Sequence, residues 1–246
     1  ESPYISMGNN PLLNNDILGN KWDNSNSESQ ANDVKAQAST LKANEQAFQS
    51  KLQSKINDRI EKGKNTTKLE RQLNESKMRM NEFDAAISEI EAMTNSAITY
   101  AIDNTFKTTA TGVTGEVIYD NTTNAVVIRY DKNNGFPIAT LAHELKHGYQ
   151  FQVGQVDLRR DGTGGGFLTD LTDEVASYRR EFAFSPSSLP ASINRMSSID
   201  QHFVRSLGYK SAFGPINQNT TLELINHYRV MAGRDRSFKI GNNEAE

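Results

Sequence analysis

The feature that most limits how this chain can fold is a long run of helical periodicity between residues 31 and 95. Apolar residues recur there at steps of three, four and seven in a background of Lys, Gln, Asn and Glu. The first stripe consists of Val34, Ala38, Leu41, Phe48, Leu52, Ile56 and Ile60. The second consists of Leu69, Leu73, Met80, Phe83, Ile87, Ile90 and Met93. The pattern predicts two long amphipathic helices in an antiparallel hairpin, joined across a break at 63–67.

The stretches around this hairpin suggest a division of the 246 residues into three parts. Residues 1–30 are rich in Asn, Ser, Gly and Asp, which predicts a weakly ordered linker. Residues 31–95 form the helical arm, which serves either as a structural pair or as a surface for a partner. Residues 96–246 are long enough to bury a core of their own, and we expect the compact domain there.

Composition excludes several classes of function. The net charge is −3 with acidic and basic residues interspersed, so we expect no nucleic acid partner. The chain has no cysteine, so any zinc ion must be held by imidazole and carboxylate groups. No apolar run reaches the roughly 18 residues that a membrane span needs, and no signal peptide pattern is present.

Beyond the arm, the sequence indicates strands followed by a helix. Strand-like runs at 116–119 and 125–130 flank a turn-rich segment, which predicts a β-hairpin. Pro137 suits the first turn of a helix and Gly154 suits its end, which predicts a helix over 137–152. The expected fold is therefore α+β, with a small β-hairpin or sheet, an active-site helix and the preceding helical hairpin.

The predicted helix over 137–152 carries the segment His143-Glu144-Leu145-Lys146-His147. Residues at i and i+4 project from one face of a helix, so His143 and His147 can bind one Zn²⁺ ion. Glu144 is rotated by about a third of a turn from His143, which places it beside the metal as a general base. The ordinary alternative is a helix with two histidines that bind no metal.

A catalytic zinc ion needs a third protein ligand and an open position. The slot in which some zinc enzymes have a third histidine is Gly154 here, so a carboxylate is the better candidate. A further helix, opened by Asp170 or Thr172, supplies carboxylates. We select Glu174 as the third ligand, with Asp173 and Glu181 as competitors.

Peptide hydrolysis also needs a hydrogen-bond donor for the oxyanion of the tetrahedral intermediate. His227 and Tyr228 are the first choice, and Tyr209 and His202 are the other candidates. For each of these residues, an ordinary packing role is the competing interpretation. The substrate is expected along the cleft edge that the strands near 126–130 form.

The segments 141–150 and 173–178 resemble the metallopeptidase toxin domains at the C-termini of bacterial polymorphic toxins. The resemblance implies a zincin fold, a zinc ion on His143, His147 and Glu174, and a general base at Glu144. Residues 2–11, Ser-Pro-Tyr-Ile-Ser-Met-Gly-Asn-Asn-Pro, resemble the end of the Rhs-repeat core that precedes such domains. Together the resemblances imply an antibacterial effector that is secreted or delivered into a target cell, cleaves proteins there, and is neutralised by a cognate immunity protein.

Two other functions are compatible with the same residues. The chain could be a binding or inhibitory module that acts through the helical hairpin, in which case a fourth protein ligand would close the metal site. It could also be a zinc hydrolase that acts on a non-peptide amide.

Overall fold

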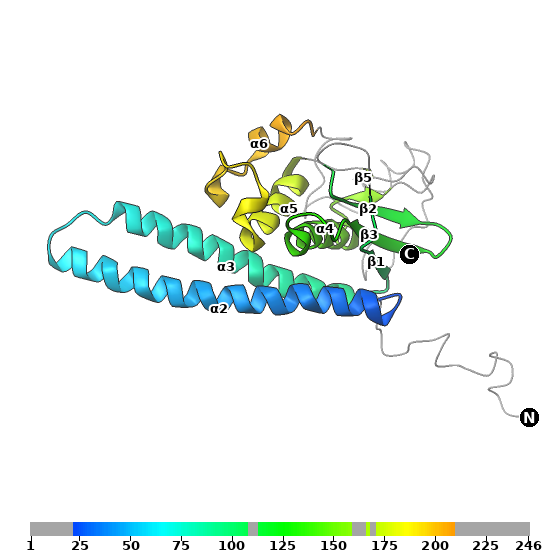
Figure 1. Cartoon of the computed structure of the whole chain (residues 1–246), viewed down its shortest axis with the longest axis horizontal. Helices are drawn as coiled ribbons and strands as arrows, with labels where there is room; N and C mark the ends of the chain where they lie inside the picture. The colour runs from blue at the N-terminus through cyan, green and yellow to red at the C-terminus, as the bar shows by residue number, and fades with distance from the viewer. Residues whose placement is uncertain (1–21, 108–112, 159–165, 168–170, 210–246) are drawn as a thin grey trace, which may run out of the picture.

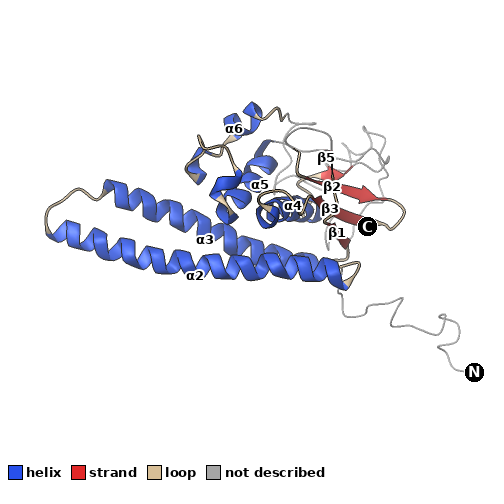
Figure 2. Ribbon diagram, viewed as in Figure 1, coloured by secondary structure: helices blue, strands red, loops and turns tan. Residues whose placement is uncertain are grey.

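The computed structural model describes residues 22–107, 113–158, 166–167 and 171–209. Within them the chain has an α+β fold, with helices packed around a small mixed sheet (Figure 2). The helices are α2 (Ser25–Glu61), α3 (Thr67–Thr94), α4 (Pro137–Gln152), α5 (Leu171–Phe184) and α6 (Gln201–Ser206), with 3₁₀ turns at Pro186–Ser188 and Met196–Ser198. The strands are β1 (Thr99–Asp103), β2 (Gly115–Asp120), β3 (Ala125–Tyr130), β4 (Asp157–Leu158) and β5 (Gly166–Phe167).

Helices α2 and α3 form the predicted antiparallel hairpin (Figure 1). Gly63, just after the end of α2, has a φ of 62°, a left-handed conformation that glycine adopts at little cost. Helix α2 begins at Ser25, where the side chain of Asn24 accepts a hydrogen bond from the backbone N–H of Ser27. The expectation of weak order is therefore wrong for residues 25–30, and the boundary suggested at residue 31 falls inside a helix.

The polar start of α2 is ordered because its side chains pair with the sheet. The hydroxyl of Ser27 accepts a hydrogen bond from the backbone N–H of Ile102 at 2.9 Å. The hydroxyl of Tyr130 donates to Oε1 of Gln30, also at 2.9 Å. Trp22, just before the helix, is buried. A segment with the composition of a loop therefore belongs to the core.

The sheet has the strand order β1-β3-β2. Strands β2 and β3 form the predicted hairpin, with Gly115 opposite Tyr130 and Asp120 opposite Ala125. Strand β1, which the sequence pattern did not indicate, pairs in parallel with the other side of β3. Strand β3 is paired on both sides, so β1 and β2 are the outer strands of this sheet among the described residues.

Helix α4 has the predicted bounds and packs between α3 and the sheet. Pro137 occupies its first turn, and Gly154 beyond its end has a φ of 76°. A Cβ atom on Gly148 would lie 3.0 Å from Cε of Met93 and 3.2 Å from Cδ1 of Ile128. The glycine therefore allows α4 to contact both neighbours closely.

One hydrophobic cluster joins the base of the arm to the rest of the fold. Its fully buried members from the arm are Ala31, Val34, Ala38, Phe83, Ala86 and Met93. Farther out, Ile60 is 61% exposed, and the distal end of the hairpin extends away from the body (Figure 1). The base of the arm therefore shares its core with α4, α5 and the sheet. No helix in the described part of the chain is long and apolar enough to cross a bilayer.

Candidate metal centre

Two neighbouring helices bring together the three predicted metal ligands. Helix α4 supplies His143 and His147, and α5 supplies Glu174. The two Nε2 atoms are 3.2 Å apart. Oε2 of Glu174 lies 3.5 Å from Nε2 of His147 and 3.8 Å from Nε2 of His143. These three residues form a group that could hold a metal ion.

In both histidines Nδ1, the ring nitrogen that points away from the other ligands, contacts a hydrogen-bond acceptor. This contact fixes the orientation of the ring and therefore of Nε2. Nδ1 of His143 lies 3.0 Å from Oε2 of Glu181, a carboxylate that accepts a hydrogen bond from it. Nδ1 of His147 lies 2.7 Å from Oε1 of Gln150. The amide N–H of Gln150 donates to the carbonyl oxygen of Asp173 at 3.0 Å, so Oε1 is the atom left to accept from His147. In the neutral form of each histidine, the lone pair of Nε2 therefore faces the other two ligand atoms.

The convergence of three acceptor atoms suits a cation. Oε2 of Glu174 is buried and has no hydrogen-bond partner among the described residues. In a tetrahedral zinc site with bonds of about 2.0–2.1 Å, ligand atoms are roughly 3.3 Å apart. The separations of 3.2, 3.5 and 3.8 Å between these atoms lie close to that value. The three residues fit a small divalent metal ion.

The charges around the two histidines favour bound protons, which a metal cation would have to displace. Burial opposes a charge on His147, but Glu174, Glu144 and Gln150 together outweigh it and raise the pKa of His147 to about 9. Burial likewise opposes a charge on His143, yet the hydrogen bond that its Nδ1 donates to Glu181, together with nearby carboxylate charges, raises the pKa of His143. Burial works against ionisation of Glu174 too, but the facing His147 lowers the pKa of this carboxyl.

Glu144 lies against the first residue of β2. The residue is 6% exposed, and a Cβ atom on Gly115 would lie only 2.6 Å from Oε1 of Glu144. Burial raises the pKa of Glu144 to about 7, although the charges of His143 and His147 oppose this shift. A carboxyl with a pKa near neutrality can both accept and return a proton, which is what a general base in hydrolysis must do.

These residues line a cavity of about 170 Å³. Its walls consist of Gly115, Glu116, Val117, His143, Glu144, His147, Val156, Leu158, Glu174 and Tyr209. The start of β2 lies on one side of the cavity and β4 on another. The metal group and the candidate base therefore share one cavity beside the start of β2.

Tyr209, which lines this cavity, pairs with Tyr178 beside His143. The ring of Tyr178 packs edge-on against the ring of His143, with the centroids 4.6 Å apart. The hydroxyls of Tyr178 and Tyr209 are 3.1 Å apart. Burial, and next the charge of Glu174, raises the pKa of Tyr209, so its hydroxyl keeps its proton at neutral pH and remains a donor.

The structure separates the other residues that the sequence suggested. Among the competitors for the third ligand, Glu181 contacts Nδ1 of His143, and Asp173 is not part of the metal group. Tyr209 lines the cavity, whereas His202 is an exposed residue of α6. His227 and Tyr228 lie outside the described residues.

Sequence reasoning missed the supporting roles of three residues. Glu181 and Gln150 orient the histidines from α5 and from the last turn of α4. The sequence spacing could have indicated the role of Gln150, because it follows His147 at the i+3 spacing of helix neighbours. Gly115 had no such pattern, because its contact with Glu144 joins segments that are distant in the sequence.

Comparisons with models of protein families, with curated proteins and with solved structures found no match for this chain.

Proposed function

We propose that the protein is a zinc-dependent metallopeptidase. The observation that carries this proposal is the convergence of His143, His147 and the unpartnered Glu174 oxygen in the cavity that also holds Glu144. Two imidazoles and one carboxylate are a common ligand set of catalytic zinc, with a fourth position left for water or substrate. Within the described residues the group has three members, so a fourth position is available.

A bound zinc ion would polarise the substrate carbonyl and lower the pKa of a water molecule. Glu144 then accepts the proton of the attacking water and returns it to the leaving amine. Glu181 and Gln150 hold the two histidines in the tautomer that metal binding requires. The hydroxyl of Tyr209 is the described donor best placed to hydrogen-bond the oxyanion of the tetrahedral intermediate.

The outer edge of β2, at the strand's start beside the metal group, is the proposed place for a peptide. An extended chain can add to such an edge through main-chain hydrogen bonds. Gly115 and Val117 of this strand line the cavity beside the metal group, so a peptide on β2 would pass over Glu144. This geometry favours a peptide substrate over a small non-peptide amide.

The test compares the zinc-loaded wild type with Glu144→Gln on an unfolded protein substrate. Because the glutamine cannot accept a proton, we expect cleavage to fall about 10²- to 10⁴-fold while the bound zinc is retained. Metal content by mass spectrometry and circular dichroism are the controls. A Glu144→Gln protein that keeps its zinc and cleaves as fast as the wild type would contradict the proposal.

The resemblance to toxin domains extends the proposal to an effector that cleaves proteins in a target bacterium and is bound by an immunity protein. Expression of the wild type and of Glu144→Gln in the cytoplasm and in the periplasm tests this extension. We expect the wild type alone to arrest growth, in the compartment that holds its substrate. Equal toxicity of both proteins would instead favour a binding module.

A further inference from the structure

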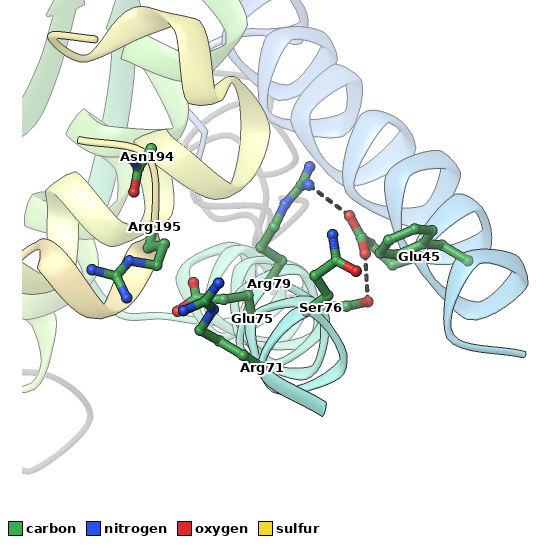
Figure 3. Close-up of a pocket in the computed structure, with 9 residues that line it drawn as sticks. Glu45, Arg71, Glu75, Ser76, Arg79, Asn194 and Arg195 are labelled. Carbon is green, nitrogen blue, oxygen red and sulfur yellow. Dashed lines mark hydrogen bonds and ion pairs between the residues drawn. The ribbon is translucent and has the colours of Figure 1, made fainter. Parts of the chain in front are cut away.

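A cavity of about 530 Å³, larger than the one at the metal group, lies between the arm and the loop that precedes Met196–Ser198 (Figure 3). Its walls consist of Glu45, Phe48, Arg71, Gln72, Glu75, Ser76, Arg79, Asn194 and Arg195. The volume is within the range of about 300–1,000 Å³ that is typical of small-molecule sites. None of these residues lines the cavity that holds Glu144.

Both acidic residues of this cavity are engaged by neighbouring donors. The carboxylate of Glu45 pairs with Arg79 at 2.7 Å and also accepts a hydrogen bond from Ser76 (Figure 3). The carboxylate of Glu75 accepts from the backbone N–H of Met196 at 2.8 Å and from the hydroxyl of Ser197 at 2.6 Å. These contacts join α2 to α3 and α3 to the 3₁₀ turn, so the carboxylates hold the walls of the cavity together.

The remaining charges of the cavity are positive. Arg71 and Arg195 are exposed and make no ion pair with any residue that the structure describes. They approach the cavity from different elements, Arg71 from α3 and Arg195 from the loop before the 3₁₀ turn (Figure 3). Arginine presents a planar fork of donors that matches carboxylate and phosphate oxygens. These two guanidinium groups are therefore suited to binding an oxyanion.

An aromatic side chain supplies an apolar wall. Phe48 on α2 lines the cavity and is 42% exposed, although it belongs to the apolar stripe of the arm. An inorganic anion would leave this ring in contact with water, whereas an anion carried on an apolar body would cover it. The combination of two free guanidinium groups and one open ring favours an organic anion.

We propose that this cavity is a binding site for a small organic anion, in which Arg71 and Arg195 bind a carboxylate or phosphate group and Phe48 packs against its apolar body. The site is separate from the metal centre and does not depend on the proposed peptidase activity. Arg79 also donates a hydrogen bond to the carbonyl oxygen of Ala183 on α5, the helix that carries Glu174. A ligand here would therefore bind where the arm meets a ligand-bearing helix.

The experiment measures binding by calorimetry, with thermal unfolding of the full chain as a second readout. The probes are phenyl phosphate, benzoate, neutral benzamide and inorganic phosphate. We expect saturable binding of phenyl phosphate or benzoate, and the stronger of the two identifies phosphate or carboxylate as the preferred group. Arg71→Gln and Arg195→Gln should each weaken this binding about tenfold or more, because each removes a charge-assisted contact.

Three control variants locate the site. Arg205→Gln removes an exposed arginine of α6 that does not line the cavity, and it should leave binding unchanged. His143→Ala should also leave binding unchanged, which excludes anion binding at the metal centre. Phe48→Ala should weaken phenyl phosphate more than inorganic phosphate. The proposal is overturned if benzamide binds as well as the anions, if no probe saturates at millimolar concentration, or if the double variant of Arg71 and Arg195 binds like the wild type.

Discussion

At the scale of single residues, two glutamates of α5 have opposite relations to His143. Oε2 of Glu174 faces Nε2 of His143 at 3.8 Å, and Oε2 of Glu181 contacts Nδ1 at 3.0 Å. The two residues are about two helical turns apart and share a face, so the sequence identified them as competitors. Only the position of α5 against α4 decides that Glu174 joins the metal group and that Glu181 orients a ligand.

The role of Glu181 predicts an effect on metal affinity. Glu181→Ala should weaken zinc binding about 10- to 100-fold, because His143 loses the acceptor that fixes its ring. Glu181→Gln, whose amide oxygen can still accept from Nδ1, should recover part of the loss. Zinc titration against a competing chelator measures both. Glu91→Gln, an exposed change on α3, is the control, and an equal affinity in Glu181→Ala and this control would contradict the role.

The raised histidine pKa values predict that zinc and protons compete. With the pKa of His147 at about 9, this side chain carries a proton at neutral pH when no metal is bound, and metal binding must displace it. Zinc affinity should therefore rise with pH between about 6 and 9, and protons should be released on binding. Calorimetry in two buffers of different ionisation enthalpy counts these protons. A pH-independent affinity without proton release would refute this description.

At the scale of elements, the contact between β2 and α4 brings the candidate base to the strand edge. A Cβ atom on Gly115 would lie 2.6 Å from Oε1 and 2.7 Å from Cγ of Glu144, so any side chain there would force the Glu144 carboxyl to move. The first residue of β2 and the second residue of the motif are therefore coupled, although they belong to different elements.

This contact predicts that Gly115→Ala displaces Glu144. Cleavage should fall at least about tenfold while zinc is retained, because a general base acts only within hydrogen-bond reach of its proton. Gly135→Ala is a matched control, since a Cβ atom there would meet nothing within 4 Å. Activity in Gly115→Ala equal to that of Gly135→Ala would show that the contact does not matter.

Sequence patterns predicted the elements whose partners are close in the chain. The β2–β3 hairpin and α4 follow from local alternation, helical spacing and Pro137. Strand β1 escaped prediction because its partner β3 follows β2, so its pairing is non-local. The start of α2 escaped because buried Ser27 and Gln30 resemble loop residues until their partners in the sheet are known.

At the scale of the whole molecule, a buried ion-pair cluster joins the arm to both ligand-bearing helices. Arg180 of α5 is 2% exposed and pairs with Glu82 and Glu89 of α3, each at 3.0 Å. Glu89 also pairs with Lys146 of α4 at 2.6 Å. Lys146 lies on α4 and Arg180 on α5, so the cluster ties the two helices that carry the metal ligands to α3. The arm is therefore part of the framework of the site.

Removing the centre of this cluster should destabilise the protein strongly. Arg180→Ala leaves Glu82 without this partner and leaves Glu89 with Lys146 alone, and we expect a loss of about 3–5 kcal/mol in the free energy of unfolding. Arg129→Ala, which breaks a pair whose arginine is 35% exposed, should cost about 1 kcal/mol or less. Urea denaturation measures both. Similar losses in the two variants would mean that the cluster does not hold the fold together.

The most direct test of the metal centre is anomalous diffraction at the zinc edge from crystals of the zinc-loaded protein. The predicted result is a single strong peak about 2.0–2.2 Å from Nε2 of His143, Nε2 of His147 and an oxygen of Glu174, with no fourth protein ligand. A peak elsewhere, or a fourth side chain closing the coordination sphere, would contradict an open catalytic centre at these residues.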